Sequence, residues 1–445
     1  GFWECALSTE SLLSRLTHTL AGLLFVAALG GCATVVQPPP AENYVERAVA
    51  RAGDDVATRA AVLAAPEVAE VFGARLDLVG IQPVYLEVRN LGAEGYLLFL
   101  SSVDRDYFSP YEVARRAAGL LNKGTDTLYP NLRDQEVPRY IPPGQTVSGF
   151  VYTHVDEGLK SFDIELLSSR RHQKFHVAVD VPGLTTDYAD FDPDDLHRAP
   201  IARFDAPNDL RTWAWDLPCC AASAEGVEGD PLNLVLVGYA DDVRGALSAA
   251  GWDVTAVADG PSIQRMVTAF LFGSRFRYAP VSELFLFGRG QDMAFQKARA
   301  AIDERNHIRL WLAPATLKEV PVWVGHVSRD AGVKLSGRLW PPTTHVIDPA
   351  VDDARYYVLQ DLLRTRQVTD LGLVRATEAV GHDAPKTNAE GDPYFTDGLR
   401  MVVFLDDRFT ALNDVRLLDW VHAADVAPFE PSGLFSAPDT AWTLP

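Results

Sequence analysis

The stretch Asp230-Pro-Leu-Asn-Leu-Val-Leu-Val-Gly238 decides the fold of the second half of the chain. It is an apolar run that ends in glycine, and a helical pattern follows from Asp241 to Gly251. A short apolar run between turn formers is typical of a strand that is buried on both faces. We therefore expect a buried strand, followed by a helix, at the start of a second domain.

Further elements follow this unit without a regular period. The apolar patterns predict strands at 284–288, 307–312, 322–329 and 401–405, and helices at 261–272, 351–364 and around 413–421. Strands and helices mixed in this way indicate an α+β domain with a mixed sheet. We place this domain at residues 230–430 and a proline-rich tail at 431–445.

An alternating pattern distinguishes residues 75–184. Val84, Leu86 and Val88 alternate with Tyr85, Glu87 and Arg89, and the runs 162–166 and 175–179 repeat this period of two. Turn formers at 141–144 and 156–158 separate the runs. Short alternating strands between turns predict an antiparallel β-sandwich of immunoglobulin-like type. The protein is thus expected to be multidomain, with the sandwich first and the α+β domain second.

Two connecting regions complete the predicted organisation. Residues 32–74 begin with a proline-rich, extended tether, and an alanine-rich pattern from Tyr44 to Ala65 predicts a helix. Residues 185–229 are mostly polar and acidic, which indicates a linker between the domains.

The first 31 residues carry the signature of a secretory leader. Arg15 and His18 precede the apolar run 20–29, and Leu29-Gly30-Gly31-Cys32 follows. An apolar run this short spans only half of a bilayer core, so it predicts a signal peptide rather than a membrane anchor. The last four residues resemble the bacterial lipobox, in which the cysteine receives a diacylglycerol and becomes the new N-terminus. We therefore expect cleavage before Cys32 and attachment to a membrane through lipid on its sulfur.

Charge restricts the partners. The chain has 60 acidic and 40 basic residues, a net charge of −20. Nucleic-acid binding requires clustered lysine and arginine, so we exclude DNA and RNA as partners. Ala33 follows the lipobox cysteine, and by resemblance to Gram-negative lipoproteins this indicates the outer membrane, facing the periplasm.

A series of short motifs between residues 230 and 370 resembles the LssY-type C-terminal domain. The motifs are Asp230-Pro-Leu-Asn-Leu-Val, Gly251-Trp252, Leu286-Phe-Gly-Arg289, His307-Ile-Arg-Leu-Trp311, Val322-Trp-Val-Gly325 and Thr344-His-Val-Ile-Asp-Pro349. Leu217-Pro-Cys-Cys220 also resembles what precedes that domain in some members. The resemblance implies a link to a type I secretion component. In other members the domain is joined to membrane regions of the DedA and PAP2-phosphatase types.

Polar residues in these strands are the candidates for chemistry. His307, Arg309 and Trp311 share one face of a strand, because side chains alternate along a strand. One hypothesis is a phosphate pocket, in which Arg309 and Arg329 clamp the anion while His307 and His345 act as acid and base. In another, His307, His345 and Asp348 ligate a metal. The third interpretation is structural: these residues are paired side chains that fix strand register.

The remaining candidates are the adjacent cysteines and two small polar groups. Cys219 and Cys220 are expected to be packed thiols, a redox pair or a vicinal disulfide in an oxidising compartment. His172 and His176 lie four residues apart on a predicted strand, too far apart to chelate one ion, and Asp104 and Asp106 lack a calcium-loop spacing. We interpret both groups as structural and expect no metal or other cofactor.

Three functions follow from these observations. The first is an envelope-anchored lipoprotein with a binding or structural role toward an envelope protein or another ligand. The second is a phosphoester hydrolase of the lipid-headgroup type in the second domain. The third is an accessory component of a secretion or envelope-maintenance system. The residues leave open whether the protein is an enzyme.

Overall fold

The structure is a computed structural model that describes residues 43–121, 124–184, 186, 188, 201–256, 278, 280–298, 305–335 and 343–420. All of them belong to one compact unit, residues 40–445. The predicted leader 1–31, Cys32, the helix 261–272 and the tail 431–445 lie outside the described residues. Among the helices that the structure describes, none is long and apolar enough to cross a bilayer.

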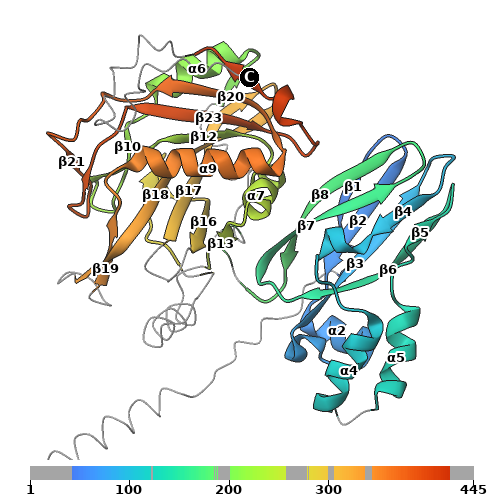
Figure 1. Ribbon diagram of the computed structural model, residues 1–445. Helices are drawn as coiled ribbons and strands as arrows, with labels where there is room; N and C mark the ends of the chain where they lie inside the picture. Colours follow the sequence, from blue (N-terminus) through green and yellow to red (C-terminus); the bar gives the residue numbers. More distant parts are fainter. Residues whose placement is uncertain are drawn as a thin grey trace, which may run out of the picture. The chain divides into compact units, whose positions relative to one another are not determined.

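Residues 43–184 form two four-stranded antiparallel sheets (Figure 1). One has the order β1-β2-β3-β6 and the other the order β5-β4-β7-β8. Val84 and Leu86 of the first sheet share a core with Ile164 and Val177 of the second, which confirms the strands predicted from the alternating pattern. The strands are β1 (Val49–Ala52), β2 (Val56–Val62), β3 (Ile81–Asn90), β4 (Tyr96–Phe99), β5 (Tyr140–Ile141), β6 (Thr146–His154), β7 (Gly158–Leu167) and β8 (His172–Val181).

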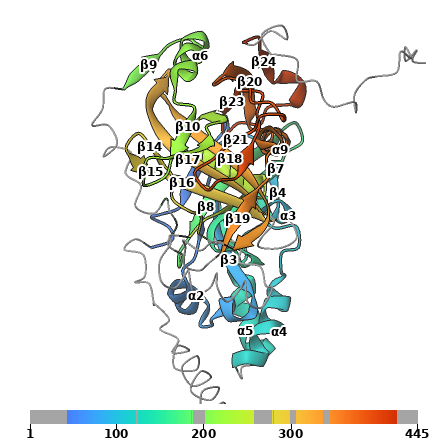
Figure 2. The same cartoon turned by 90° about the vertical axis from the view of Figure 1, so that its left-hand side faces the viewer.

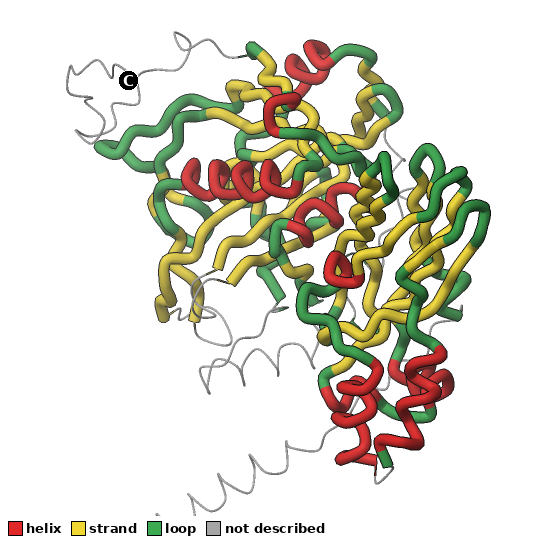
Figure 3. Tube along the Cα trace, turned by 45° about the vertical axis from the view of Figure 1, so that its right-hand side comes forward, coloured by secondary structure: helices red, strands yellow, loops and turns green. Residues whose placement is uncertain are grey.

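Helices cover the other face of the β3 sheet. Phe72 and Val113 from the helices pack against Tyr85 of β3 and Phe150 of β6 in a separate apolar cluster. The helical segments gather beside these strands in Figure 3. Strand β3 is therefore buried on both faces along most of its length. The helical elements are α2 (Ala65–Phe72), η1 (Leu76–Val79), α3 (Leu100–Val103), α4 (Pro110–Leu121) and α5 (Thr125–Asp134).

The helix predicted from Tyr44 to Ala65 is wrong. This segment contains β1 and β2, and β2 pairs antiparallel with β3 from Val56 to Val62. Alanine favours a helix only weakly in isolation. Here Val56 and Val62 enter the core between the two sheets, and this burial outweighs the local preference.

A ten-stranded mixed sheet is the centre of the region from 201 to 420 (Figure 1). Its main path is β13-β16-β17-β18-β12-β23-β20-β24, while β19 pairs with β18 and β9 with β17. Strand β12 is antiparallel to β18 and parallel to β23, and all four of its residues are buried, which confirms the predicted buried strand. The strands are β9 (Ala202–Phe204), β12 (Leu234–Val237), β13 (Asp253–Val254), β16 (Met293–Ala298), β17 (Arg305–Leu317), β18 (Val320–Leu335), β19 (Thr343–Ile347), β20 (Val368–Arg375), β23 (Leu399–Leu405) and β24 (Arg416–Leu418).

Helices lie on both faces of this sheet. Val358 of α9 (Val351–Thr365) and Leu247 of α7 (Ala240–Ala249) belong to one core with Leu236 of β12. Figure 1 shows α9 running across that face. On the opposite face, Leu210 of α6 (Pro207–Asp216) packs in a cluster with Val235. The predicted helices at 241–251 and 351–364 are therefore confirmed as α7 and α9.

Two further sequence predictions differ from the structure. Residues 201–229, predicted as linker, contain β9 and α6, which lie side by side in Figure 2, with the rings of Phe204 and Trp213 6.0 Å apart. The predicted helix around 413–421 is wrong, because η3 (Leu412–Asp414) and β24 occupy this segment. Small sheets and hairpins complete the region: β10 (Cys220–Ala222), β11 (Glu228–Pro231), β14 (Phe285–Leu286), β15 (Arg289–Gly290), β21 (Lys386–Thr387) and β22 (Pro393–Tyr394).

Candidate functional site

A row of polar side chains follows one face of β16, β17 and β18. The register places His307 between Gln296 and Ser328, and Arg309 beside His326. Residues directly opposite each other in antiparallel strands point to the same face, so these side chains share one surface of the sheet. All of them are buried. Further along the same face, Trp311 belongs to the apolar cluster with α6.

His307 forms one half of this buried cluster. Its Nε2 lies 2.6 Å from Asp330 Oδ2, and the two residues are only 5% and 3% exposed. Arg305 Nε is 3.9 Å from the same carboxylate, and its Nη1 donates to Gln296 Oε1 over 2.6 Å. Burial, together with the neighbouring arginines, lowers the pKa of His307 to about 4. The imidazole is therefore neutral at pH 7 and donates its Nε2–H to Asp330.

His326 is the centre of the other half. It is 1% exposed, and its Nε2 accepts a hydrogen bond from Arg309 Nη1 over 3.1 Å and lies 3.3 Å from Asp230 Oδ2. Burial, with Arg309 and His307 nearby, lowers the pKa of His326 well below its ordinary value. Burial also raises the pKa of Asp230. The hydrogen bond that Asn388 Nδ2 donates to its Oδ1 over 2.8 Å acts in the opposite direction and lowers this pKa, but its effect is smaller.

The buried cluster is balanced in charge by its own members. Arg305 lies beside Asp330, the charge of Arg309 acts on Asp230, and burial lowers the pKa of both histidines. Arg309 also donates to the backbone oxygen of Ser282 over 2.9 Å. Charges can be buried when they are paired and hydrogen-bonded in this way. The arrangement therefore helps to fix the register of three strands, and among the described residues the Nε2 of His307 is buried against Asp330.

The structure separates the other predicted catalytic residues from this cluster. Arg329 points to the opposite face of β18, where its Nε donates to Asn306 Oδ1 over 3.2 Å. Its Nη1 lies 3.9 Å from Asp348 Oδ2, so these two predicted residues do meet each other. His345 pairs with Val333 along β19, and its side chain lies outside the described part. Arg309 and Arg329 therefore do not face a common anion.

Asp230, His326 and Asp330 belong to the buried cluster although they were not among the predicted site residues. The alternation along β18 already places His326 and Asp330 on one face. What was missing was the pairing of β17 with β18, which brings this face together with that of His307. Asp230 lies in a different strand, β11, and no local pattern connects it with His326.

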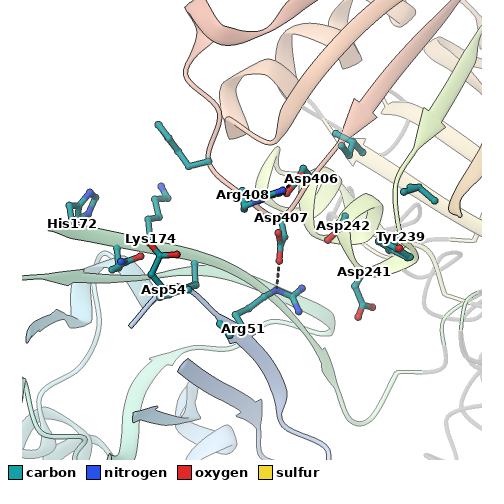
Figure 4. Close-up of a pocket in the computed structure, with 17 residues that line it drawn as sticks. Arg51, Asp54, His172, Lys174, Tyr239, Asp241, Asp242, Asp406, Asp407 and Arg408 are labelled. Atoms are coloured by element: carbon teal, nitrogen blue, oxygen red, sulfur yellow. Dashed lines mark hydrogen bonds and ion pairs between the residues drawn. The ribbon is translucent and has the colours of Figure 1, made fainter. Parts of the chain in front are cut away.

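An open pocket of about 890 Å³ lies elsewhere in the unit (Figure 4). One wall is formed by the β1–β2 turn and β8, and the other by the start of α7 and the segment after β23. Its volume is within the range of small-ligand sites, about 300–1,000 Å³. Tyr239 and Phe409, which are 55% and 57% exposed, contribute aromatic surface to it. Its charged lining consists of five acids and three bases: Asp54, Asp241, Asp242, Asp406, Asp407, Arg51, Lys174 and Arg408.

Carboxylates in this pocket repel one another. Burial, and then the charge of Asp407, raises the pKa of Asp242 to about 6. Burial and a hydrogen bond with Asp406 raise the pKa of Asp407. Arg51 offsets this repulsion only in part, since its Nε is 4.0 Å from Asp407 Oδ2, the contact drawn in Figure 4.

The bases of the pocket already have acidic partners. Arg408 Nε lies 3.3 Å from Asp406 Oδ1, and Lys174 Nζ lies 2.8 Å from Asp163 Oδ2. His172 also lines the pocket and lies 3.2 Å from Glu165. The unbalanced charge of the pocket is therefore negative.

The polar groups interpreted as structural have local partners. His176 Nδ1 lies 3.0 Å from Asp163 Oδ1, and its Nε2 lies 3.0 Å from the backbone oxygen of Gly245. Asp104 accepts hydrogen bonds from the backbone nitrogens of Asp106 and His154. In the segment before β11, the sulfurs of Cys219 and Cys220 are joined in a vicinal disulfide.

Comparison with known families assigns the mixed-sheet region. Residues 215–399 match the family model LssY_C, described as the LssY C-terminus. The chain thus contains an LssY C-terminal domain, as the motifs between 230 and 370 predicted. The match extends from Trp215 in α6 to Leu399 in β23, so it includes the buried cluster and the disulfide. A comparison with curated proteins gave no match to the chain.

Proposed function

We propose that the protein is a lipid-anchored lipoprotein of the bacterial envelope with a binding role. The lipobox-like Leu29-Gly30-Gly31-Cys32 supports the anchor, and Ala33 supports the outer membrane, facing the periplasm. The Cys219–Cys220 disulfide supports a location outside the cytosol, because such bonds persist in oxidising compartments. We further propose that the two N-terminal sheets are an immunoglobulin-like sandwich that holds one wall of the binding pocket.

One observation carries the binding role. The histidine expected to act as a catalyst, His307, is closed off by Asp330, whereas the pocket beside Asp242 is open and lined by charges that lack full compensation. A binding site needs accessible surface with a few oriented polar groups. The pocket meets this requirement, and the buried cluster does not.

The ligand that fits the pocket carries basic groups. A cationic side chain would relieve the repulsion that raises the pKa of Asp242, and it would find aromatic faces in Tyr239 and Phe409. We therefore propose a lysine- or arginine-rich segment of an envelope protein as the partner. Complementary charge of this kind chiefly sets specificity and the rate of association.

Binding of an oligolysine peptide to the full chain tests this proposal. The double variant Asp242→Asn with Asp407→Asn should raise the dissociation constant about thirtyfold, because each of the two lost ion pairs contributes about 1 kcal/mol at a partly exposed site. Asp216→Asn, an exposed acid of α6 outside the pocket, is the matched control for one lost charge and should change it less than twofold. An equal loss of affinity per removed charge in both variants would show that net charge alone attracts the peptide and would exclude the pocket.

The hydrolase alternative makes a different prediction. A phosphoester hydrolase would turn over a generic phosphodiester, and His345→Ala would abolish that turnover while leaving the fold intact. The separation of Arg329 from Arg309 on opposite faces of β18 weighs against the anion clamp that such an enzyme would use. An accessory role in secretion rests on the resemblance of the sequence motifs alone and requires a partner, which the pocket would bind.

A further inference from the structure

The vicinal cysteines lie beside a carboxylate. Glu228 begins β11, the strand that follows and pairs with β10, where Cys220 aligns with Pro231 and Ala222 with Glu228. The two sulfurs and a carboxylate oxygen of Glu228 all lie within 4.8 Å of one another. Cys219 is half-buried and Glu228 is exposed, so the group lies at the surface of the fold.

The backbone around the cysteines is held independently of the sulfur–sulfur bond. Arg400 is fully buried, and it donates to the backbone oxygens of Pro218 over 2.8 Å, Leu232 over 2.7 Å and Ala214. The backbone nitrogen of Leu232 donates to the oxygen of Cys219 over 2.8 Å. These contacts fix the segment on both sides. The two thiols therefore stay together when the bond between them is broken.

We propose that Cys219, Cys220 and Glu228 form a redox-gated site for a thiophilic divalent cation such as Zn²⁺. In the oxidised chain the sulfurs bond each other and offer no thiolate. Two thiolates and one carboxylate are a ligand set that Zn²⁺ accepts, with a fourth position left for water. A preorganised pair of thiols binds more tightly than two independent ones, because less freedom is lost on binding.

A dithiol reductant can open the site. A thiolate of the reductant attacks one sulfur, the Cys219–Cys220 bond breaks, and the departing cysteine sulfur takes up a proton. The second thiol of the reductant then breaks the mixed disulfide, which leaves the reductant oxidised to its own disulfide and both cysteines as thiols. The cation displaces two protons when it binds the two sulfurs.

Titration with Cd²⁺ tests the site, because a cadmium–thiolate bond has a charge-transfer absorption that carboxylates do not give. The protein is the full chain with Cys5→Ser and Cys32→Ser, so that Cys219 and Cys220 are its remaining cysteines. A phosphine reduces the disulfide and does not compete as a dithiol chelator. We expect the reduced chain to bind one Cd²⁺ at least about a hundredfold more tightly than the oxidised chain, with the absorption band present.

The variants separate the carboxylate from the thiols. Glu228→Gln should weaken Cd²⁺ binding about tenfold, whereas Glu225→Gln, an exposed acid in the neighbouring turn, should leave it unchanged. The oxidised chain is an internal control that needs no further substitution. The proposal is overturned if reduction yields no absorption band, if both redox forms bind Cd²⁺ equally, or if Cys219→Ser retains the band.

Discussion

His307 of β17 and Asp330 of β18 are joined by a hydrogen bond of 2.6 Å, and both residues are buried. The bond links two adjacent strands: His307 lies directly opposite Ser328, and Asp330 is two residues further along β18 on the same face. Its donor is a neutral imidazole, because burial lowers the pKa of His307 to about 4. Asp330 therefore depends on His307 and Arg305 for compensation of its buried charge.

Removal of this donor should destabilise the domain. His307→Ala removes the donor that lies 2.6 Å from the buried carboxylate of Asp330, and we expect the free energy of unfolding to fall by about 3 kcal/mol. His307→Gln keeps an N–H donor and should reduce it by about 1 kcal/mol. Urea denaturation measures both changes. His172→Ala, an exposed histidine, is the control, and a loss there as large as that of His307→Ala would contradict a specific role for the buried pair.

Acid should weaken the fold in a way that depends on His307. Between pH 6.5 and pH 4 the unfolded histidine binds a proton that the folded one does not, so the stability present above pH 6.5 is lost as the pH falls. From pH 6.5 to pH 5 the loss from this group is about 2 kcal/mol. Denaturation midpoints at both pH values should show this loss in the native chain and a smaller one in His307→Gln. Identical pH profiles of the two proteins would exclude the effect.

Arg400 should be one of the most sensitive positions in the chain. Its guanidinium is buried without solvent contact, burial lowers its pKa to about 10, and it donates to three backbone oxygens. Arg400→Met should lower the free energy of unfolding by about 3 kcal/mol, because these oxygens lose their donors. Arg408→Met, at an exposed arginine, should change it by less than about 0.5 kcal/mol in the same denaturation experiment.

Lipid attachment is tested in cells. Cys32→Ser should move the protein from the membrane fraction to the soluble envelope fraction, since acyl chains contribute roughly 0.8 kcal/mol for each buried methylene and two or three chains anchor firmly. Mass spectrometry of the N-terminal peptide should show diacylglycerol on the sulfur of the native protein. An unmodified Cys32, or an uncleaved leader, would contradict the anchor.

The strands and helices that carry strong periodic patterns could be predicted from the sequence, and the weak ones could not. The runs at 307–312 and 322–329 became β17 and β18, although both strands extend several residues further. In β1 and β2 the alanines favour a helix, and only pairing with β3, which is distant in sequence, makes the segment extended. Local preference therefore failed where tertiary pairing decides the structure.

The candidate site shows the same division. Alternation along β17 correctly placed His307 and Arg309 on one face, because this depends on the strand alone. The partners Asp330 and His326 follow from the register with β18, and Asp230 follows from the position of β11. The pocket combines Arg51 with Asp407, residues from opposite ends of the described chain, so no motif could have indicated it.

The parallel pairing of β12 with β23 has a consequence for biogenesis. Leu234 pairs with Met401, so the central strand acquires one of its two neighbours only when about nine tenths of the chain has been synthesised. Until then β12 lacks its neighbour β23, and the sheet remains incomplete at its centre. Long-range pairing of this kind delays folding. The region around β12 therefore completes its folding only after nearly all of the chain has left the ribosome.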